Sequence, residues 1–159
     1  MADFQPVVFR LGDERYGIDI SYVNAIERTQ SIVRVPNSAR SIKGIINLRG
    51  EIIPVVDLRS KFRLMDSEFP EDSEFIIVDM GKNKIAIEVD TVEGIHNTEE
   101  EYVIDMPIIA KGDGVEYFDS IVKVNDKLVI IINPMELLSE KEIKAVERLA
   151  EENKKPSKG

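Results

Sequence analysis

The sequence predicts an all-β fold made of two small barrels that are copies of one unit. Three observations support this prediction. Short apolar segments alternate with turn residues over most of the 159 residues. The same series of apolar positions and turns occurs twice along the chain. Helical spacing is confined to short turns and to one segment near the C-terminus.

The duplication is visible when the chain is compared with itself. Residues 9–20 align with residues 78–89, so that glycine meets glycine and the apolar positions after it coincide. This first alignment continues to Val23 and Ile26, which fall on Val92 and Ile95.

A second alignment places residues 45–57 over residues 121–133. Its offset is larger than that of the first alignment, so the second half contains about seven extra residues, in part in the Gly-rich segment 111–114. Turns that match at matched spacing favour duplication over a chance alignment of β-rich segments.

The first half begins with a predicted hairpin. Residues 7–11 lead as a strand into Gly12-Asp13, which is a two-residue turn signal. Residues 15–20 return as the partner strand.

Short elements are expected after this hairpin. Asp19 can cap one helical turn, in which Val23 and Ile26 share a face at i, i+3 spacing. Residues 32–35 then form a brief strand that ends at Pro36.

A second hairpin joins residues 44–48 to residues 51–57 through the dipeptide Arg49-Gly50. Its counterpart in the second half turns at Asn125-Asp126, a favourable pair for a type I′ turn. Each half therefore has four or five short strands with tight turns. This pattern predicts a closed or nearly closed barrel of the SH3 size class in each half.

Some strands are apolar on consecutive residues, so that both of their faces are apolar. They comprise residues 52–56, 75–78 and 128–132. A barrel wall that faces water alternates between apolar and polar residues, so these outer faces need a cover. Packing between the barrels can cover part, and a protein partner the rest. Pro54 cannot donate a hydrogen bond to a neighbouring strand, which favours an edge or bulge position.

The C-terminal segment has helical character from residue 139 to residue 152. Ser139 and Glu142 form a capping-box pattern. Ile143, Val146 and then Leu149 and Ala150 make an apolar stripe. We expect this helix to pack on the second barrel, the alternative being a free helix that binds a partner. Residues 153–159 are expected to be disordered.

Composition excludes several classes of protein. The net charge is −9 and no cluster of Lys and Arg lies outside the last few residues, which disfavours nucleic acid as a partner. Cysteine is absent, which excludes disulfides and thiolate chemistry and fits a reducing compartment. Residues 1–6 do not resemble a signal peptide, and the longest apolar run, 128–132, is too short to span a bilayer. We expect a soluble cytoplasmic protein that does not insert into the membrane.

The polar residues do not form a recognisable catalytic set. The single histidine, His96, has no Ser or Cys motif beside it. Glu99, Glu100 and Glu101 are consecutive, so on a helix they point in different directions, which favours a solvated face over a metal site. The segment 112–114 lacks the strand and helix that flank phosphate-binding loops.

Three aspartates lie near predicted strand ends, namely Asp57, Asp79 and Asp90. Such carboxylates often accept hydrogen bonds from the N–H groups of turns. Two of them acting as a general acid and base is the alternative. The sequence therefore predicts no catalytic residue, metal, cofactor or small-molecule substrate.

Arg49 stands at the tip of a hairpin between apolar strands, beside a glycine that lets another backbone approach closely. A guanidinium there can donate to a partner's carboxylate or carbonyl oxygens. A solvated turn arginine is an equally good interpretation.

Two segments of the chain are distinctive, namely residues 11–20 (LGDERYGIDI) and, after Pro36, residues 42–59 (IKGIINLRGEIIPVVDLR). Both closely resemble the CheW family of bacterial chemotaxis coupling proteins. The resemblance extends over residues 3–144 and implies two intertwined, five-stranded SH3-like barrels. We expect these subdomains at residues 15–65 and 73–135, with exchange of chain near their ends.

The resemblance also implies a function. A protein of this family is a non-catalytic scaffold that couples the cytoplasmic tip of transmembrane chemoreceptors to the regulatory domain of the histidine kinase CheA in membrane receptor arrays. Position by position, one set of residues falls in the receptor-binding region and another in the kinase-binding region. The receptor set is Val23, Ile26, Glu27, Gly44 and Arg49, and the kinase set is Ala86 and Ile87.

The chain departs from the family pattern at two positions. Ala25 stands where the family often has Glu, and Glu27 is displaced from it by two residues. Ala86 stands where well-known members have Gly. The alternatives are a kinase regulatory domain or the coupling domain of a related chemotaxis protein and, from another class, a carboxylate- or metal-dependent β-barrel enzyme. The polar tail before Gly159 favours a separate adaptor.

Overall fold

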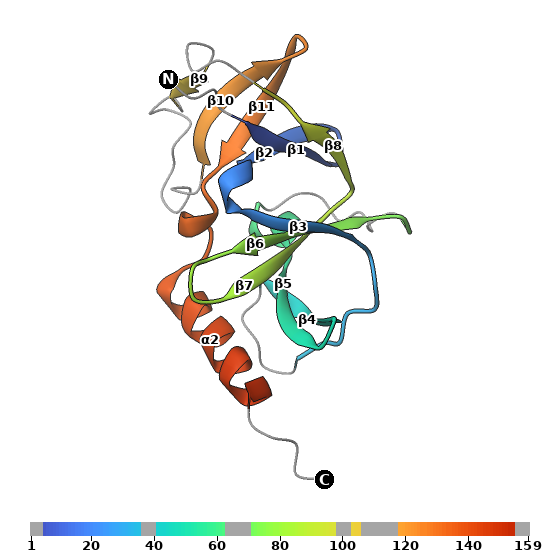
Figure 1. Ribbon diagram of the computed structural model, residues 1–159. Coiled ribbons are helices and arrows are strands. Elements are labelled where there is room, and N and C mark those ends of the chain that lie inside the picture. Colours follow the sequence, from blue (N-terminus) through green and yellow to red (C-terminus); the bar gives the residue numbers. More distant parts are fainter. Residues whose placement is uncertain (1–4, 36–40, 63–70, 98–102, 106–117, 155–159) are drawn as a thin grey trace.

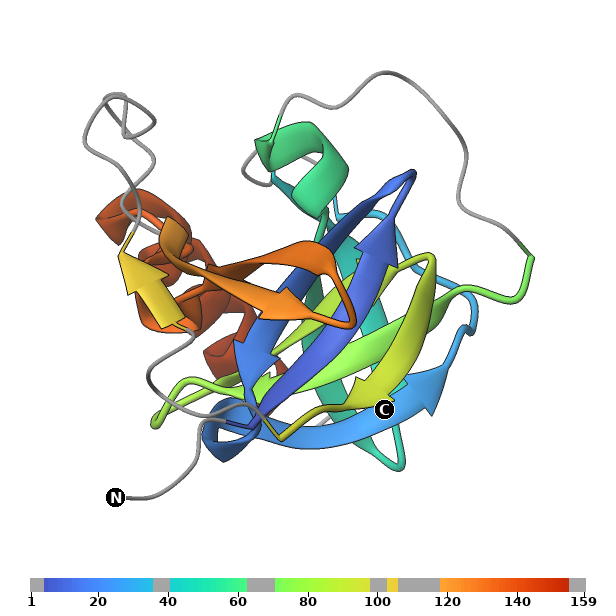
Figure 2. The same cartoon turned by 90° about the horizontal axis from the view of Figure 1, so that it is seen from above.

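The computed structural model contains two β-sheets that lie one above the other (Figure 1). It describes residues 5–35, 41–62, 71–97, 103–105 and 118–154. Figure 2 looks down on the six-stranded sheet, with the five-stranded sheet beneath it. The all-β fold class predicted from the sequence is confirmed.

The strands form hairpins that are joined across each sheet by one parallel pair. The six-stranded sheet has the order β8-β1-β2-β11-β10-β9 and the five-stranded sheet the order β3-β6-β7-β5-β4. The first contains β1 (Pro6–Leu11), β2 (Glu14–Asp19), β8 (Thr91–Ile95), β9 (Val103–Asp105), β10 (Phe118–Val124) and β11 (Lys127–Ile132). The second contains β3 (Val23–Arg28), β4 (Ile42–Leu48), β5 (Glu51–Val56), β6 (Glu74–Asp79) and β7 (Lys84–Val89).

Helical segments of different length accompany the sheets in the described part of the chain. They are the short η1 (Ile20–Tyr22), α1 (Leu58–Lys61) and η4 (Pro134–Glu136), and the longer α2 (Glu140–Lys154). Within the described residues, no helix is both long enough and apolar enough to cross a membrane.

The strand register reproduces the duplication found in the sequence. In the six-stranded sheet, Gly17 of β2 pairs with Ile131 of β11 in a parallel arrangement. In the five-stranded sheet, Ala86 of β7 pairs with Val55 of β5 in the same way. The first alignment of the sequence with itself relates Gly17 to Ala86, and the second relates Val55 to Ile131. The halves are therefore equivalent in pairing as well as in pattern.

The exchange of chain between the barrels is larger than the ranges 15–65 and 73–135 indicate. Strands β1 and β2 pair with β8 and β11, whereas β6 and β7 pair with β3 and β5. Each half thus gives its whole first hairpin to the sheet that contains the later strands of the other half. The hairpins are local and can be predicted, but the long-range parallel pairs decide which sheet they join.

The core explains why several strands are apolar on both faces. In β6, Phe75 and Ile77 belong to a cluster with residues of the five-stranded sheet alone. Ile76 and Val78 belong to a cluster shared by both sheets. All four side chains are 0% exposed. Of the two covers expected for such strands, packing between the barrels is the one that β6 has, because the second sheet covers it.

Two local predictions near the N-terminal hairpin need correction. Val23 and Ile26 lie on strand β3 and not on a helical turn, and the short helix η1 precedes them. Val23 packs against the shared core, whereas Ile26 is 39% exposed. The two side chains still share a face, because the bulge in β3 lets Val23 pair with Val78 and Ile26 with Ile76, two residues on the same side of β6. The strand predicted at residues 32–35 is reduced to a single bridge between Val33 and Ile45.

Pro54 lies inside the sheet and not at its edge. It pairs with Ile45 of β4, and the parallel pairing of β5 with β7 begins one residue later, at Val55. The lack of an N–H group at Pro54 therefore costs no hydrogen bond to β7, because pairing with β7 begins only at Val55.

Helix α2 begins with the predicted capping box. Ser139 Oγ accepts a hydrogen bond from the Glu142 N–H at 3.2 Å, and Glu142 Oε1 accepts one from the Ser139 N–H at 2.9 Å. The helix packs beside β5 of the five-stranded sheet, which differs from the place expected on the second barrel (Figure 1). Glu142 also pairs with Lys61 of α1 at 2.8 Å, which fixes the start of the helix on this barrel.

The helix is longer than predicted, because Asn153 and Lys154 are helical. Pro36 and residues 99–101, 111–114 and 155–159, on which further predictions fall, lie outside the described residues.

Candidate functional site

The β4–β5 turn carries Arg49 in a conformation that few residues adopt. Arg49 has φ 51° and Gly50 has φ 87°, and the flanking Leu48 and Glu51 are paired. Left-handed φ values at both central positions are the mark of a type I′ hairpin turn. Asn47 Oδ1 accepts a hydrogen bond from the Gly50 N–H at 2.9 Å. This hydrogen bond holds the turn in the conformation that places Arg49 at its tip.

Arg49 is paired with Glu27, which is on the opposite edge strand of the same sheet. Arg49 Nη2 lies 2.9 Å from Glu27 Oε1. The side chain of Arg49 is 70% exposed and that of Glu27 is 24% exposed. The folding of the barrel thus brings together two of the residues assigned to the receptor set.

Gly44 has a structural reason to be glycine. A Cβ atom there would lie 2.3 Å from the backbone oxygen of Val33, closer than real Cβ contacts occur. Val33 and Ile45 exchange two backbone hydrogen bonds of 2.8 and 2.9 Å beside it. Gly44 therefore lets the segment after β3 close the barrel against β4.

The receptor set is only partly on the surface. Ile26, Glu27 and Arg49 belong to one accessible corner, which we call the Arg49 corner. Gly44 is buried in β4 and Val23 packs against the shared core. Glu27 and Arg49 contact each other at this corner, and Ile26, next to Glu27 on β3, points to the other face of the sheet.

The two residues of the kinase set are not accessible. Ala86 and Ile87 are both 0% exposed. Strand β7 lies between β6 and β5, so these residues are not at an edge of the sheet. The apolar character of Ala86 and Ile87 indicates that they are removed from water. It does not show whether they belong to an interface with a partner or to the core of the chain itself.

Two exposed apolar side chains on the six-stranded sheet were not predicted from the sequence. Ile95 of β8 is 55% exposed and Leu128 of β11 is 65% exposed. A cavity of about 200 Å³ in the same sheet is lined by His96, Asn125 and residues of β1, β2, β8, β10 and β11. Leu128 belongs to an apolar run that is evident in the sequence, but only the register shows which member stays outside.

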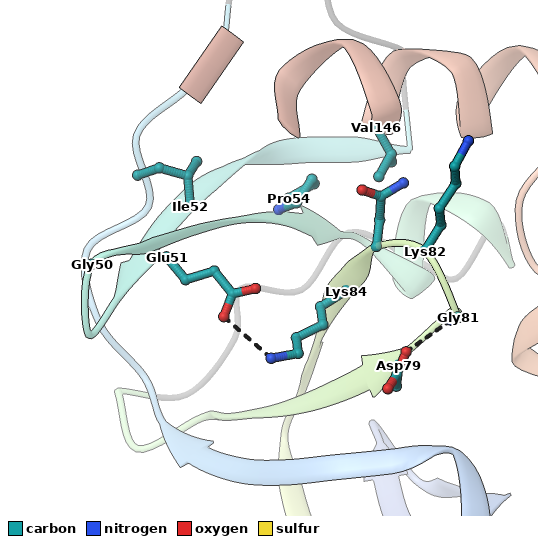
Figure 3. Close-up of a pocket in the computed structure, with 10 residues that line it drawn as sticks. Gly50, Glu51, Ile52, Pro54, Asp79, Gly81, Lys82, Lys84 and Val146 are labelled. Carbon is teal, nitrogen blue, oxygen red and sulfur yellow. Dashed lines mark hydrogen bonds and ion pairs between the residues drawn. The ribbon is translucent and has the colours of Figure 1, made fainter. Parts of the chain in front are cut away.

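A larger cavity of about 320 Å³ lies between the β4–β5 turn, the β6–β7 turn and α2 (Figure 3). Ile52, Pro54 and Val146 give it apolar walls. Two of its charged groups are engaged with each other, since Lys84 Nζ donates to Glu51 Oε2 at 3.2 Å.

The aspartates singled out in the sequence serve turns and caps. Asp57 Oδ1 accepts from the Ser60 N–H at 3.2 Å and Asp79 Oδ1 from the Gly81 N–H at 2.8 Å. Asp90 Oδ2 accepts from the Gly12 N–H at 2.9 Å, while its other oxygen accepts from Arg59. Among the described residues, no three His, Cys, Asp or Glu side chains form a group that could hold a metal ion.

The sequence matches the family described as "CheW-like domain" over residues 5–142. It is 32% identical to the chemotaxis protein CheW of Klebsiella aerogenes, over 91% of this chain and 87% of that protein. It is also 32% identical to the chemotaxis protein CheW of Treponema pallidum, over 92% of this chain and 88% of that protein.

The fold is similar to a crystal structure of the scaffolding protein TtCheW from Thermoanaerobacter tengcongensis. The TM-score is 0.80 at 34% sequence identity, and the match covers 89% of this chain and 92% of the other.

Proposed function

The chain belongs to the CheW-like family, and we propose that it is a non-catalytic scaffold that couples chemoreceptors to the histidine kinase CheA. The role of chemotaxis coupling adaptor follows from this membership. We propose further that the protein works in the cytoplasm and is recruited to membrane receptor arrays by its two partners.

The observation that carries the receptor part of the proposal is the Arg49 corner. Arg49 is 70% exposed, and one of its Nη atoms already contacts Glu27. A guanidinium has five N–H donors, so it can hold Glu27 and still donate to a partner. The tip of a helical hairpin offers carbonyl oxygens that lack partners within the helix. We therefore place the receptor tip at Ile26, Glu27 and Arg49, with Val23 and Gly44 supporting that corner from within.

The kinase contact needs a surface apart from the Arg49 corner. Because Ala86 and Ile87 are buried, we propose that the kinase regulatory domain binds the six-stranded sheet, which exposes the apolar side chains Ile95 and Leu128. These residues lie on the other sheet, so one chain can hold both partners at once. Two modest contacts of this kind gain strength in an array through multivalency.

Substitution of Arg49 tests the receptor part. Arg49→Ala is expected to weaken binding of a soluble receptor-tip fragment by about tenfold or more, as loss of charge-assisted hydrogen bonds does. Its thermal stability is expected to stay close to that of the parent, because Arg49 is an exposed turn residue. Titration calorimetry measures the affinity.

Arg148→Ala is the matched control, since it removes an exposed arginine from α2. If Arg49→Ala binds the receptor fragment as tightly as the parent, Arg49 is a turn residue only and the receptor site lies elsewhere.

A further inference from the structure

The duplication gives the molecule a second corner equivalent to the Arg49 corner. Ile95 corresponds to Ile26 in the first alignment of the two halves, and both are exposed, at 55% and 39%. Asn125 corresponds to Arg49 in the second alignment. Their φ values are 49° and 51°, so both occupy the same position of the same kind of turn. We call this second site the Asn125 corner.

The two corners carry charge at different positions, and in the second corner Arg15 and Glu93, which also line its cavity, form an ion pair of 2.6 Å. Glu27 and Arg49 form an ion pair of 2.9 Å in the first corner. Their counterparts in the second corner are His96 and Asn125, which both line the cavity of about 200 Å³. The backbone is thus the same at both corners, whereas the Glu27–Arg49 pair of the first corner is replaced by His96 and Asn125 in the second.

We propose that the Glu27–Arg49 pair is the specificity determinant that makes the receptor choose one of the two equivalent corners. The inference rests on the proposed function, because it takes the Arg49 corner as the receptor site. The inference adds that backbone shape and the exposed isoleucine are not enough to bind the receptor, since both corners have them.

The chemistry of the two pairs supports this assignment. Arginine carries a fixed charge and a planar fork of donors, whereas asparagine has a short, neutral amide. Glu27 is held by strand pairing with Phe75 of β6 and is less exposed than Arg49. It therefore orients the guanidinium before a partner arrives, which reduces the entropy lost on binding. His96 and Asn125 offer neither a fixed positive charge nor such an anchor.

A reciprocal exchange of the two pairs tests the inference. One variant carries Glu27→His and Arg49→Asn, so that both corners have the neutral pair. A second variant adds His96→Glu and Asn125→Arg, which moves the charged pair to the Asn125 corner. The turn accepts arginine, as the φ value of Arg49 shows. The probe is a soluble fragment carrying the cytoplasmic helical tip of a chemoreceptor, and amide chemical shifts locate its binding site.

The first variant is expected to lose binding by about tenfold or more. The second is expected to regain it, with shifted amides on β8 and in the β10–β11 turn in place of those on β3 and in the β4–β5 turn. A third variant, with only His96→Glu and Asn125→Arg, is expected to bind two fragments per chain. Circular dichroism and thermal unfolding show which variants are folded.

Failure of the inference can be told from failure of the proposed function. If Arg49→Ala does not weaken binding, the receptor site itself is wrong. If Arg49→Ala weakens binding but the folded second and third variants gain no site at the Asn125 corner, the pair is not the determinant and the inference falls alone. If the second variant, which has four substitutions, does not fold, the number of receptor fragments bound by the third variant tests the inference. Two fragments per chain support it and one contradicts it.

Discussion

At the scale of single residues, the contact between Gly44 and Val33 leads to a prediction about stability. Gly44→Ala is expected to destabilise the protein by about 2 kcal/mol or more, because the added Cβ meets a backbone oxygen that cannot move away easily. Chemical denaturation followed by circular dichroism measures the loss.

Gly17→Ala is the matched control for this change. A Cβ there meets the Cδ1 atom of Ile131 first, at 2.9 Å, and such a side-chain end can adjust. The equivalent position in the other half is already Ala86. We expect a smaller loss than for Gly44→Ala. If Gly44→Ala is as stable as the parent but binds the receptor fragment poorly, Gly44 is a contact residue.

Glu142 leads to a prediction about pH. Burial raises the pKa of its carboxyl, but the hydrogen bond and charge of Lys61, with the hydrogen bonds of Ser139, outweigh burial and hold the pKa below its usual value. A lowered pKa in the folded state adds stability above the unfolded pKa of about 4.3, and this is lost as pH falls through the folded value.

Glu142→Gln removes that contribution, so its unfolding free energy should change less than that of the parent when pH falls from about 6 to about 3. Urea unfolding at several pH values checks this. Glu140→Gln, at an exposed position of the same helical turn, should follow the parent curve. Parallel curves for Glu142→Gln and the parent would show that the Lys61–Glu142 pair does not contribute.

Residue types alone predict some assignments and leave others open. Carboxylates near strand ends were expected to accept turn N–H groups, and Asp57, Asp79 and Asp90 do so. Ala86 and Ile87 were assigned to an interface by resemblance, yet both are buried. An apolar side chain indicates removal from water, and the sequence does not say whether its own chain or a partner removes it.

At the scale of elements, α2 is held to the five-stranded barrel by apolar residues that include Ile143 and Val146. Val146 is 3% exposed and belongs to the shared core. Val146→Ala is therefore expected to lower the unfolding free energy by about 1–3 kcal/mol. Denaturant unfolding measures this change.

Lys144→Ala, at an exposed position of the same helix, is the control and should stay within about 0.5 kcal/mol of the parent. An unchanged stability for Val146→Ala would mean that α2 is free in solution.

The elements also show where prediction from sequence stops. The capping box and the apolar stripe predicted α2 well, since both depend on residues three or four apart. The barrel against which it packs depends on the pairing of Lys61 with Glu142, two residues far apart in the chain. The turns at Arg49 and Asn125 were found from local pattern, whereas the Arg49–Glu27 pair required the closed barrel.

At the scale of the whole molecule, the shared core joins both barrels into one unit. It contains Phe9 and Ile18 from one sheet and Ile76 and Ile87 from the other, all 0% exposed. A large apolar interface of this kind does not allow the barrels to unfold separately. We expect one calorimetric transition in which the calorimetric and van't Hoff enthalpies agree. Two resolved transitions would show that the barrels are independent.

The exchange of hairpins between the halves also prevents the two barrels from unfolding separately. A fragment that ends at residue 65 contains β1 and β2 without their partner β11. The duplication was predicted because it is a repeat of local patterns. Exchange near the subdomain ends was implied by the family resemblance, but its extent was not. The parallel pairs of β2 with β11 and of β5 with β7, which set that extent, join residues far apart in the chain.

The central claim is that one folded chain offers two separate surfaces to two proteins. Amide shifts of the labelled chain, recorded with the receptor-tip fragment, with the kinase regulatory domain and with both together, test it most directly. We predict that the receptor fragment shifts amides around Glu27 and Arg49, that the kinase domain shifts those around Ile95 and Leu128, and that both sets shift in the mixture. Displacement of one partner by the other, or one common set of shifted amides, would contradict the claim.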